Sequence, residues 1–138
     1  MPSFAYLSWE TDLGHGNLDS DSDTYYVQLL TSSYVPNQIS HSKRSDLSGE
    51  SSGSGYAAGG QSCPLTLVPD SANKRVDYVF GAVSWPAATV TARYAAYYKR
   101  RGGLANADEL VALADFGADF STAAATFYLS STTVRKQL

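Results

Sequence analysis

Trp85-Pro-Ala-Ala-Thr-Val-Thr-Ala-Arg-Tyr-Ala-Ala-Tyr-Tyr98 is the longest strand-like run in the chain. Its β-branched and aromatic residues favour a strand, and Pro86 marks the entry. Alternate residues of a strand point to opposite faces, and here each face mixes apolar and polar side chains. The first face would carry Val90, Ala92, Tyr94, Ala96 and Tyr98, and the second Thr89, Thr91, Arg93, Ala95 and Tyr97. We therefore predict a central strand with neighbours on both sides.

Shorter runs of the same kind lie on both sides of this stretch, separated by turn residues about every ten positions. The runs predicted as strands are Ser3–Glu10, Tyr25–Thr31, Gln61–Val68, Arg75–Phe80, Leu110–Phe116 and Ala125–Ser130. The segments predicted as turns or helical turns are Ile39–Leu47, Lys99–Gly103, Ala105–Glu109 and Gly117–Thr122. This pattern predicts an all-β fold, an antiparallel β-sandwich or jelly-roll-like barrel of about seven or eight strands.

The length of 138 residues predicts one domain, residues 1–138, with a core large enough to need no metal or disulfide. Ser48–Gly60 is rich in glycine and serine, which predicts a flexible or tightly turned loop within that domain. The C-terminal tail, residues 131–138, is expected to fray. The alternative for the tail is pairing with the strand edge of a neighbouring molecule.

Charge and cysteine content exclude several classes of protein. A formal net charge of −3 is small and has the wrong sign for a dedicated binder of nucleic acid or of anionic membranes, so neither partner is expected. The one cysteine, Cys63, excludes an intramolecular disulfide and a cysteine zinc site. The first residues lack a basic segment followed by an apolar one, so we expect synthesis in the cytoplasm without a signal peptide.

Two motifs resemble ligand sites but lack the required context. Asp19-Ser-Asp-Ser-Asp23 has the carboxylate spacing of a calcium loop, yet Thr24 and Leu30 stand where glycine and glutamate are needed. A turn-capping acidic loop is favoured, and cation binding stays open. Gly53-Ser-Gly-Tyr-Ala-Ala58 fits a dinucleotide fingerprint, but it has no preceding strand and no following helix. We expect no metal and no cofactor.

Catalytic residues are not apparent either. His15 and His41 lie in separate polar loops, away from any nucleophile motif. Paired carboxylates, Asp108 with Glu109 and Asp115 with Asp119, could in principle do acid and base chemistry, but charged residues are common at strand ends. We therefore expect no enzymatic activity and no catalytic residue.

Tyrosine is abundant, and it is enriched in protein interfaces because it offers a large contact area at small entropic cost. The interface candidates are Tyr25, Tyr26, Tyr97, Tyr98, Arg100 and Arg101. The alternative for each tyrosine is an ordinary core or half-buried strand position. For the Lys99–Arg101 turn the alternatives to an interface are a solvated hairpin tip, a salt bridge or a phosphate contact.

Four stretches of the chain resemble a family of small virion structural proteins of tailed bacteriophages. They are Asp23–Asn37, Gly53–Gln61, Val83–Tyr94 and Leu113–Gly117. The specific part is Gly-x-Gly-Tyr-x-x-Gly-Gly followed by Trp-x-x-Ala-Thr-x-Thr-Ala-Arg-Tyr. The chain departs from the family pattern at the longer, more basic Lys99–Glu109 connection and in its tail.

The resemblance implies a non-enzymatic component of the phage particle, made in the host bacterial cytoplasm and located in the virion. Our leading hypothesis is a capsid decoration or cement protein, a homo-oligomer that binds the major capsid protein or neighbouring virion proteins. The alternative is a head-tail neck or tail and fibre-base component. A third hypothesis is a carbohydrate-binding module, in which exposed Trp9 and Trp85 would stack on sugars.

Overall fold

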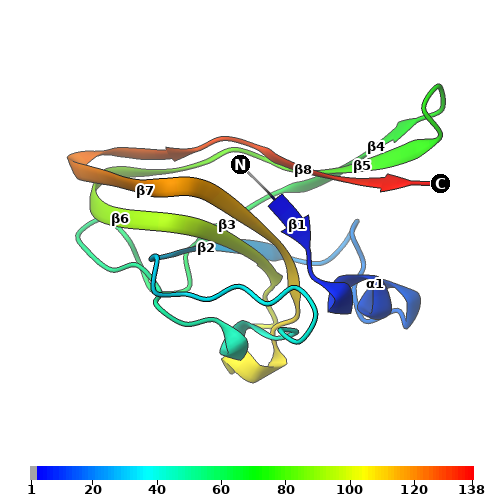
Figure 1. The fold of residues 1–138 in the computed structure, drawn as a ribbon, viewed down its shortest axis with the longest axis horizontal. Coiled ribbons are helices and arrows are strands. Elements are labelled where there is room, and N and C mark those ends of the chain that lie inside the picture. The colour runs from blue at the N-terminus through cyan, green and yellow to red at the C-terminus, as the bar shows by residue number, and fades with distance from the viewer. Residues whose placement is uncertain (1–2) are drawn as a thin grey trace.

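The structure is a computed structural model that describes residues 3–138. Two antiparallel sheets form the domain, one of five strands in the order β1-β7-β6-β2-β3 and one of three strands in the order β4-β5-β8 (Figure 1). The strands are β1 Ser3–Ala5, β2 Tyr25–Leu30, β3 Gln61–Ser62, β4 Leu65–Asp70, β5 Arg75–Phe80, β6 Val83–Lys99, β7 Leu110–Leu129 and β8 Thr132–Gln137. The helices are α1 Leu7–Gly14 and two 3-10 turns, Arg44–Asp46 and Ala105–Ala107. The predicted all-β sandwich of about eight strands is confirmed.

β6 is the middle strand of the larger sheet, as predicted, and it contains the whole Trp85–Tyr98 stretch. Its pairing with β7 shifts register between Trp85 and Ala88 and again between Ala92 and Tyr94. Each bulge switches which side chains point inward. The residues of β6 whose side chains belong to the main core are therefore Val83, Trp85, Ala88, Val90, Ala92, Ala95 and Tyr97. These bulges explain why simple alternation gave two mixed faces.

Two strand pairs connect the sheets, because each strand of one pair continues directly into a strand of the other. β5 runs into β6 and β7 runs into β8, so that Phe80 pairs with Thr132 in the small sheet while Val83 pairs with Leu129 in the large one. Beyond the second pair, β6 and β7 bend together near Ala87 and Ala124, where φ is positive, and fold back over themselves, which Figure 1 shows as a long bent ribbon. The bend brings the Phe116 and Phe127 rings of β7 within 6.4 Å of each other. The β4–β5 hairpin and β8 continue beyond the core as a projecting three-stranded arm (Figure 1).

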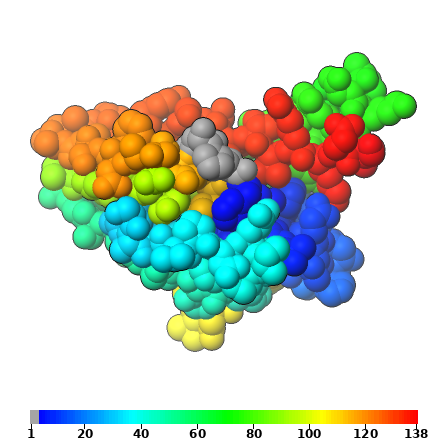
Figure 2. All heavy atoms as spheres, viewed as in Figure 1, coloured from blue at the N-terminus to red at the C-terminus, as the bar shows by residue number. Residues whose placement is uncertain are grey.

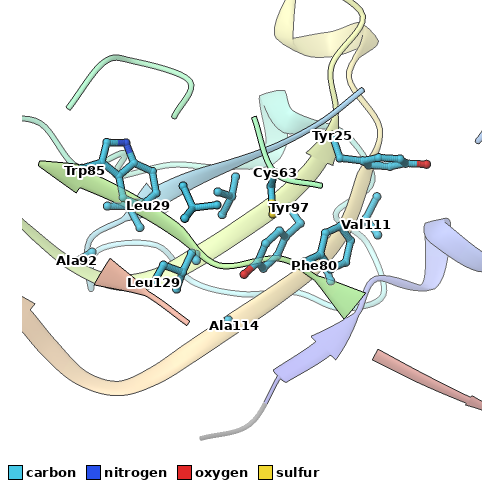
Figure 3. Packing of buried hydrophobic residues seen from close by; sticks show 14 of the residues in the cluster. Tyr25, Leu29, Cys63, Phe80, Trp85, Ala92, Tyr97, Val111, Ala114 and Leu129 are labelled. Carbon is cyan, nitrogen blue, oxygen red and sulfur yellow. The ribbon is translucent and has the colours of Figure 1, made fainter. Parts of the chain in front are cut away.

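Aromatic and aliphatic side chains fill the space between the sheets. The Phe80 ring stacks on the Tyr97 ring with centroids 4.3 Å apart, and Figure 3 shows the two rings face to face. The Tyr97 hydroxyl hydrogen-bonds to the Thr132 hydroxyl, 2.8 Å away. A second cluster covers the opposite face of the large sheet and contains Tyr6, Leu30, Tyr34, Tyr94, Ala96, Tyr98, Leu110 and Leu113. Near the end of β6, both faces of the strand are therefore buried.

The predicted first strand, Ser3–Glu10, is wrong beyond Ala5. Only Ser3–Ala5 pairs with β7, and Leu7–Gly14 forms helix α1. Trp9 and Leu13 are four residues apart, so they share one helix face and pack on the main core. The Trp9 ring contacts the Tyr78 ring edge to face at 4.8 Å. Burial of this face outweighs the apparent alternation in the sequence.

The predicted strand Gln61–Val68 is divided between the two sheets. The N–H of Cys63 donates to the Tyr25 carbonyl in the large sheet, while the Pro64 carbonyl accepts from Gly81 in the small one. β4 then continues through Pro69, where the sequence predicted an end. The chain crosses between layers at Cys63–Pro64, a change of direction that local pattern does not reveal.

The predicted turn Gly117–Thr122 is also wrong, because β7 runs without a break from Leu110 to Leu129. Gly117 and Ala124 have positive φ angles, 78° and 48°, and each is absorbed as an irregularity within the strand. The Asp115 carboxylate accepts the Gly117 N–H, and the Thr89 hydroxyl accepts the Ala124 N–H. These side-chain hydrogen bonds replace ladder bonds that the irregular backbone loses.

The C-terminal tail does not fray, and it pairs within its own domain rather than with a neighbouring molecule. Thr132–Gln137 forms strand β8 and pairs with all six residues of β5. Lys136 also lies 3.0 Å from Glu10 of helix α1. The strands Tyr25–Leu30 and Arg75–Phe80 lie where the sequence predicted them.

Ser48–Gly60 takes the tightly turned form rather than the flexible one, and it lies along the part of β6 before Tyr94, which β2 does not reach. Ser51 and Tyr56 are buried in it. The Ser51 hydroxyl donates to the Thr91 carbonyl at 2.7 Å, and the Thr89 N–H donates to the Ser54 carbonyl at 2.8 Å. The loop therefore satisfies backbone groups along the edge of β6.

Candidate interaction surfaces

Three of the six predicted interface residues belong to the interior. Tyr25, Tyr97 and Tyr98 have 3%, 0% and 1% of their surface exposed. Tyr97 lies between the sheets, and the Tyr98 hydroxyl donates to the Gly59 carbonyl at 2.6 Å. The prediction that these tyrosines contact a partner is therefore corrected: their rings are committed to the domain's own core. Sequence alternation could not decide this, because burial depends on which layers cover each face.

The remaining candidates, Tyr26, Arg100 and Arg101, lie at the end of the β6–β7 hairpin. The Arg100 guanidinium sits over the half-buried Tyr26 ring, 4.4 Å from its centroid, and keeps its charge exposed. Arg101 instead forms two hydrogen bonds with the Glu109 carboxylate, at 2.8 and 2.6 Å. Arg100 and Tyr26 are thus available to a partner, together with Leu104 at the tip, which is 74% exposed.

The carboxylates Asp108 and Glu109 are held by arginines. Asp108 accepts from the Arg44 side chain at 2.7 Å and from the Arg101 backbone N–H at 2.9 Å. Burial acts to raise the pKa of Glu109, but the Arg101 hydrogen bond and the positive charges of Lys43 and Arg101 outweigh it and hold the pKa below its ordinary value. Both carboxylates therefore fix the hairpin connection in place.

Other acidic residues also make local structural bonds. Asp115 pairs with Arg93 at 2.8 Å, and its predicted partner Asp119 lies on the exposed part of β7. In the Asp19–Asp23 loop, Asp19 accepts the backbone N–H groups of Asp21 and Ser22, so it caps the turn. Across residues 3–138, no three side chains of the histidine, cysteine, aspartate and glutamate types gather as metal ligands would.

The two histidines stay apart in the fold, as they are in the sequence. His15 follows the last residue of helix α1 as its C-cap and is exposed. His41 lies 2.7 Å, through Nδ1, from the hydroxyl of buried Tyr34, which in turn hydrogen-bonds to the Tyr6 hydroxyl at 2.9 Å. Burial raises the pKa of Tyr34 above its ordinary value, so this tyrosine is held as a neutral hydrogen-bonding group.

The tryptophans are also internal. Trp9 is 2% exposed and Trp85 is 3% exposed. Trp85 packs against the Tyr56 ring of the Gly/Ser loop and the Phe127 ring of β7, at 5.8 and 6.1 Å. The hypothesis that they stack on sugars loses its basis, because neither ring presents a face to solvent.

The projecting arm of β4, β5 and β8 is a surface that the sequence analysis missed. On β4, Leu67 and Val68 are 40% and 45% exposed, and Pro69 is exposed as well. A hollow of about 380 Å³ opens at the base of the arm, and Asp21, Asp23 and Leu65 are among the residues that line it. The run of apolar residues along β4 was the available signal, but it also fits a buried strand.

Comparisons with known proteins found no match to a family model, to a curated protein or to a solved structure. In the described part of the chain, no helix is long and apolar enough to cross a membrane.

Proposed function

We propose that this protein is a structural component of a tailed-phage particle, and specifically a decoration protein on the capsid lattice. The observation that carries the proposal is the sequence resemblance of the Gly53–Gln61 and Val83–Tyr94 blocks, whose residues also lie against each other in the fold. The proposal does not depend on the buried tyrosines.

The contact between the two blocks explains their residue types. A Cβ atom at Gly53 would collide with the Thr89 carbonyl, and one at Gly55 would lie 2.8 Å from the Ala87 carbonyl. Only glycine allows the loop to approach the β6 backbone this closely. Tyr56 then reaches under the loop, where its hydroxyl accepts the Leu29 N–H and donates to Glu50. The shared motif is thus a folding unit that closes one edge of the central strand.

The shape of the domain suits a protein that joins neighbours. Figure 2 shows the β4–β5 arm and the Lys99–Glu109 turn projecting from different sides of the molecule. The arm offers Leu67 and Val68, and the turn offers Arg100 and Leu104, so an apolar contact and a cationic one are available at separate places. A molecule with two separated contacts can bridge two subunits.

Such a protein stabilises a shell by binding the assembled form in preference to free subunits. Each copy would bury its contacts across a joint between capsid subunits, and many weak contacts add over the lattice. No chemical step is needed, which agrees with carboxylates that serve as ion-pair partners and hydrogen-bond acceptors.

Quantitative mass spectrometry of purified particles tests this proposal. A decoration protein occupies a repeated lattice site and is expected at on the order of hundreds of copies per particle. A count of about a dozen or fewer, typical of a ring, would replace decoration with the neck or tail alternative. Absence of the protein from purified particles would refute the whole structural assignment.

A second measurement separates lattice binding from binding to single subunits. The purified protein is mixed with undecorated heads or with unassembled major capsid protein, and each mixture is sedimented. Cosedimentation with heads alone is the expected result. The variant Arg100→Glu is expected to weaken it, whereas Asp119→Lys, a charge reversal at an exposed residue of β7 outside both the arm and the turn, serves as the control.

A further inference from the structure

Strand β4 presents a free and regular edge. All six residues from Leu65 to Asp70 pair with β5 in unbroken register, and no described strand pairs with the other side of β4. β4 carries one charged residue, Asp70, at its end, and no lysine. An edge of this kind is a template for another strand.

The other described edges are short, charged or irregular. β1 and β3 have three and two residues. β8 carries two cations, Arg135 and Lys136, which oppose pairing with a further strand, and Lys136 is ion-paired with Glu10 of helix α1. The open part of β7 is irregular at Gly117 and Ala124, where the φ angles are positive. Bulges of this kind prevent edge pairing, so β4 is the edge that remains suited to it.

The direction of the backbone groups of β4 follows from the register. The Pro64 carbonyl accepts the Gly81 N–H, so Pro64 faces β5 in a hydrogen-bonded pair. In an antiparallel ladder these pairs alternate. The groups of Leu65, Leu67 and Pro69 therefore point away from β5. Since proline has no N–H, two donors and three carbonyls line the free edge.

We propose that two copies of this chain pair through their β4 edges, antiparallel and about a twofold axis at Leu67. In this register, each Leu67 N–H donates to the Leu67 carbonyl of the second copy, and each Leu65 N–H donates to the Pro69 carbonyl. Both free donors of each edge are satisfied. Pro69 lies where its missing N–H interrupts no bond to β5, and the two small sheets become one sheet of six strands.

Side chains and charges favour a second copy as the occupant. Leu65, Leu67 and Pro69 share one face of β4, so a twofold pairing places Leu67 beside Leu67 and Leu65 beside Pro69. The two Asp70 carboxylates lie at opposite ends of the paired β4 strands. The hairpin turn of each copy, which carries the exposed Lys74, comes to the base of the other arm, where Asp21 lines the hollow beside Asp23, which is ion-paired with Lys99 of its own chain. The edge is thus complementary to itself in hydrogen bonds, apolar contact and charge.

This inference concerns the isolated protein and does not rest on the proposed function. Light scattering after size exclusion, from about 1 μM to about 1 mM, is expected to show a concentration-dependent dimer of the 14.8 kDa chain. Leu67→Pro removes an outward N–H and leaves the β5 ladder intact, so it is expected to be monomeric across that range. Leu67→Ala loses the same side chain but keeps the N–H, and it should still dimerise, more weakly than the native chain.

Disulfide trapping tests the register. In the proposed pair the two Leu67 Cα atoms are about 5.5 Å apart, within disulfide range, so Leu67→Cys should crosslink on oxidation. The two Val68 positions lie on a diagonal, about 7–8 Å apart, so Val68→Cys should not. Cys63 is buried and present in both variants, so any background that it causes is equal.

Charge reversal tests the contact at the base of the arm. Lys74→Glu and Asp21→Lys are each expected to weaken dimerisation, roughly threefold to tenfold, and the double variant should restore it. A monomeric native chain at about 1 mM would overturn the proposal. So would a Leu67→Pro variant that dimerises like the native chain with native circular dichroism and thermal stability, or crosslinking of Val68→Cys in place of Leu67→Cys. Particle copy number is measured separately, so failure of either proposal leaves the other intact.

Discussion

Replacing Phe80 with alanine tests how the two sheets are joined. The Phe80 side chain is fully buried, and its ring stacks on Tyr97 of the central strand at 4.3 Å. The substitution removes this ring at the end of β5, where Phe80 pairs with Leu65 on one side and Thr132 on the other, so the neighbouring backbone has little freedom to close the gap.

The expected loss of unfolding free energy is about 4 kcal/mol, within the range for Phe→Ala in a packed core. Domains of this size are stable by roughly 5–15 kcal/mol, so the variant should fold with a reduced margin. At about 4 °C per kcal/mol, its melting temperature should fall by about 16 °C. Val79→Ala is the matched control, because Val79 lies on the same strand with its side chain on the outer face, and its cost should be near 1 kcal/mol.

Urea unfolding followed by circular dichroism measures both variants. The pairwise contribution comes from a double-mutant cycle with Phe80→Leu and Tyr97→Leu, in which the coupling should be about 1 kcal/mol for a stacked pair. If Phe80→Ala costs no more than Val79→Ala, or if the coupling is zero, the two sheets do not pack through this pair of rings.

Three further predictions follow from single features of the structure. Gly53→Ala should destabilise the domain by more than about 1 kcal/mol because its Cβ meets the Thr89 carbonyl, whereas Gly14→Ala in helix α1, with open space around it, should be neutral or stabilising by thermal melting. The pKa of Glu109 is depressed on folding, so its contribution to the free energy of unfolding is complete above the ordinary pKa of 4.5 and is lost as pH falls through the lower folded pKa. Arg101→Gln should therefore flatten the acid dependence of stability measured by urea unfolding. An unchanged pH profile of stability in this variant would contradict the argument. Burial raises the pKa of Cys63 to about 12, so maleimide at neutral pH should label the thiol only after unfolding, and rapid labelling of the native protein would be inconsistent with the core.

The sequence by itself determined the class of fold and the place of its central strand. The β-branched and aromatic residues of Trp85–Tyr98 form a strand in any layered context, and the runs that became β2 and β5 have the same composition between clear turn residues. The turn at Lys99–Gly103 was equally evident, since two glycines follow three cations there. These features depend on the local conformational preferences of the residues, and packing against the neighbouring layers favours the same conformations.

Tertiary structure decided which faces are buried and where strands continue. The bulges of β6 reverse its inward face, so Tyr97 meets the second sheet and Tyr98 the opposite cluster, while Thr89 and Thr91 stay exposed. The same dependence on distant partners made Leu7–Gly14 a helix and carried β7 past Gly117. It also paired the tail with β5. A short segment takes the conformation that buries its apolar face and satisfies its backbone, and the partners that make this possible lie far along the chain.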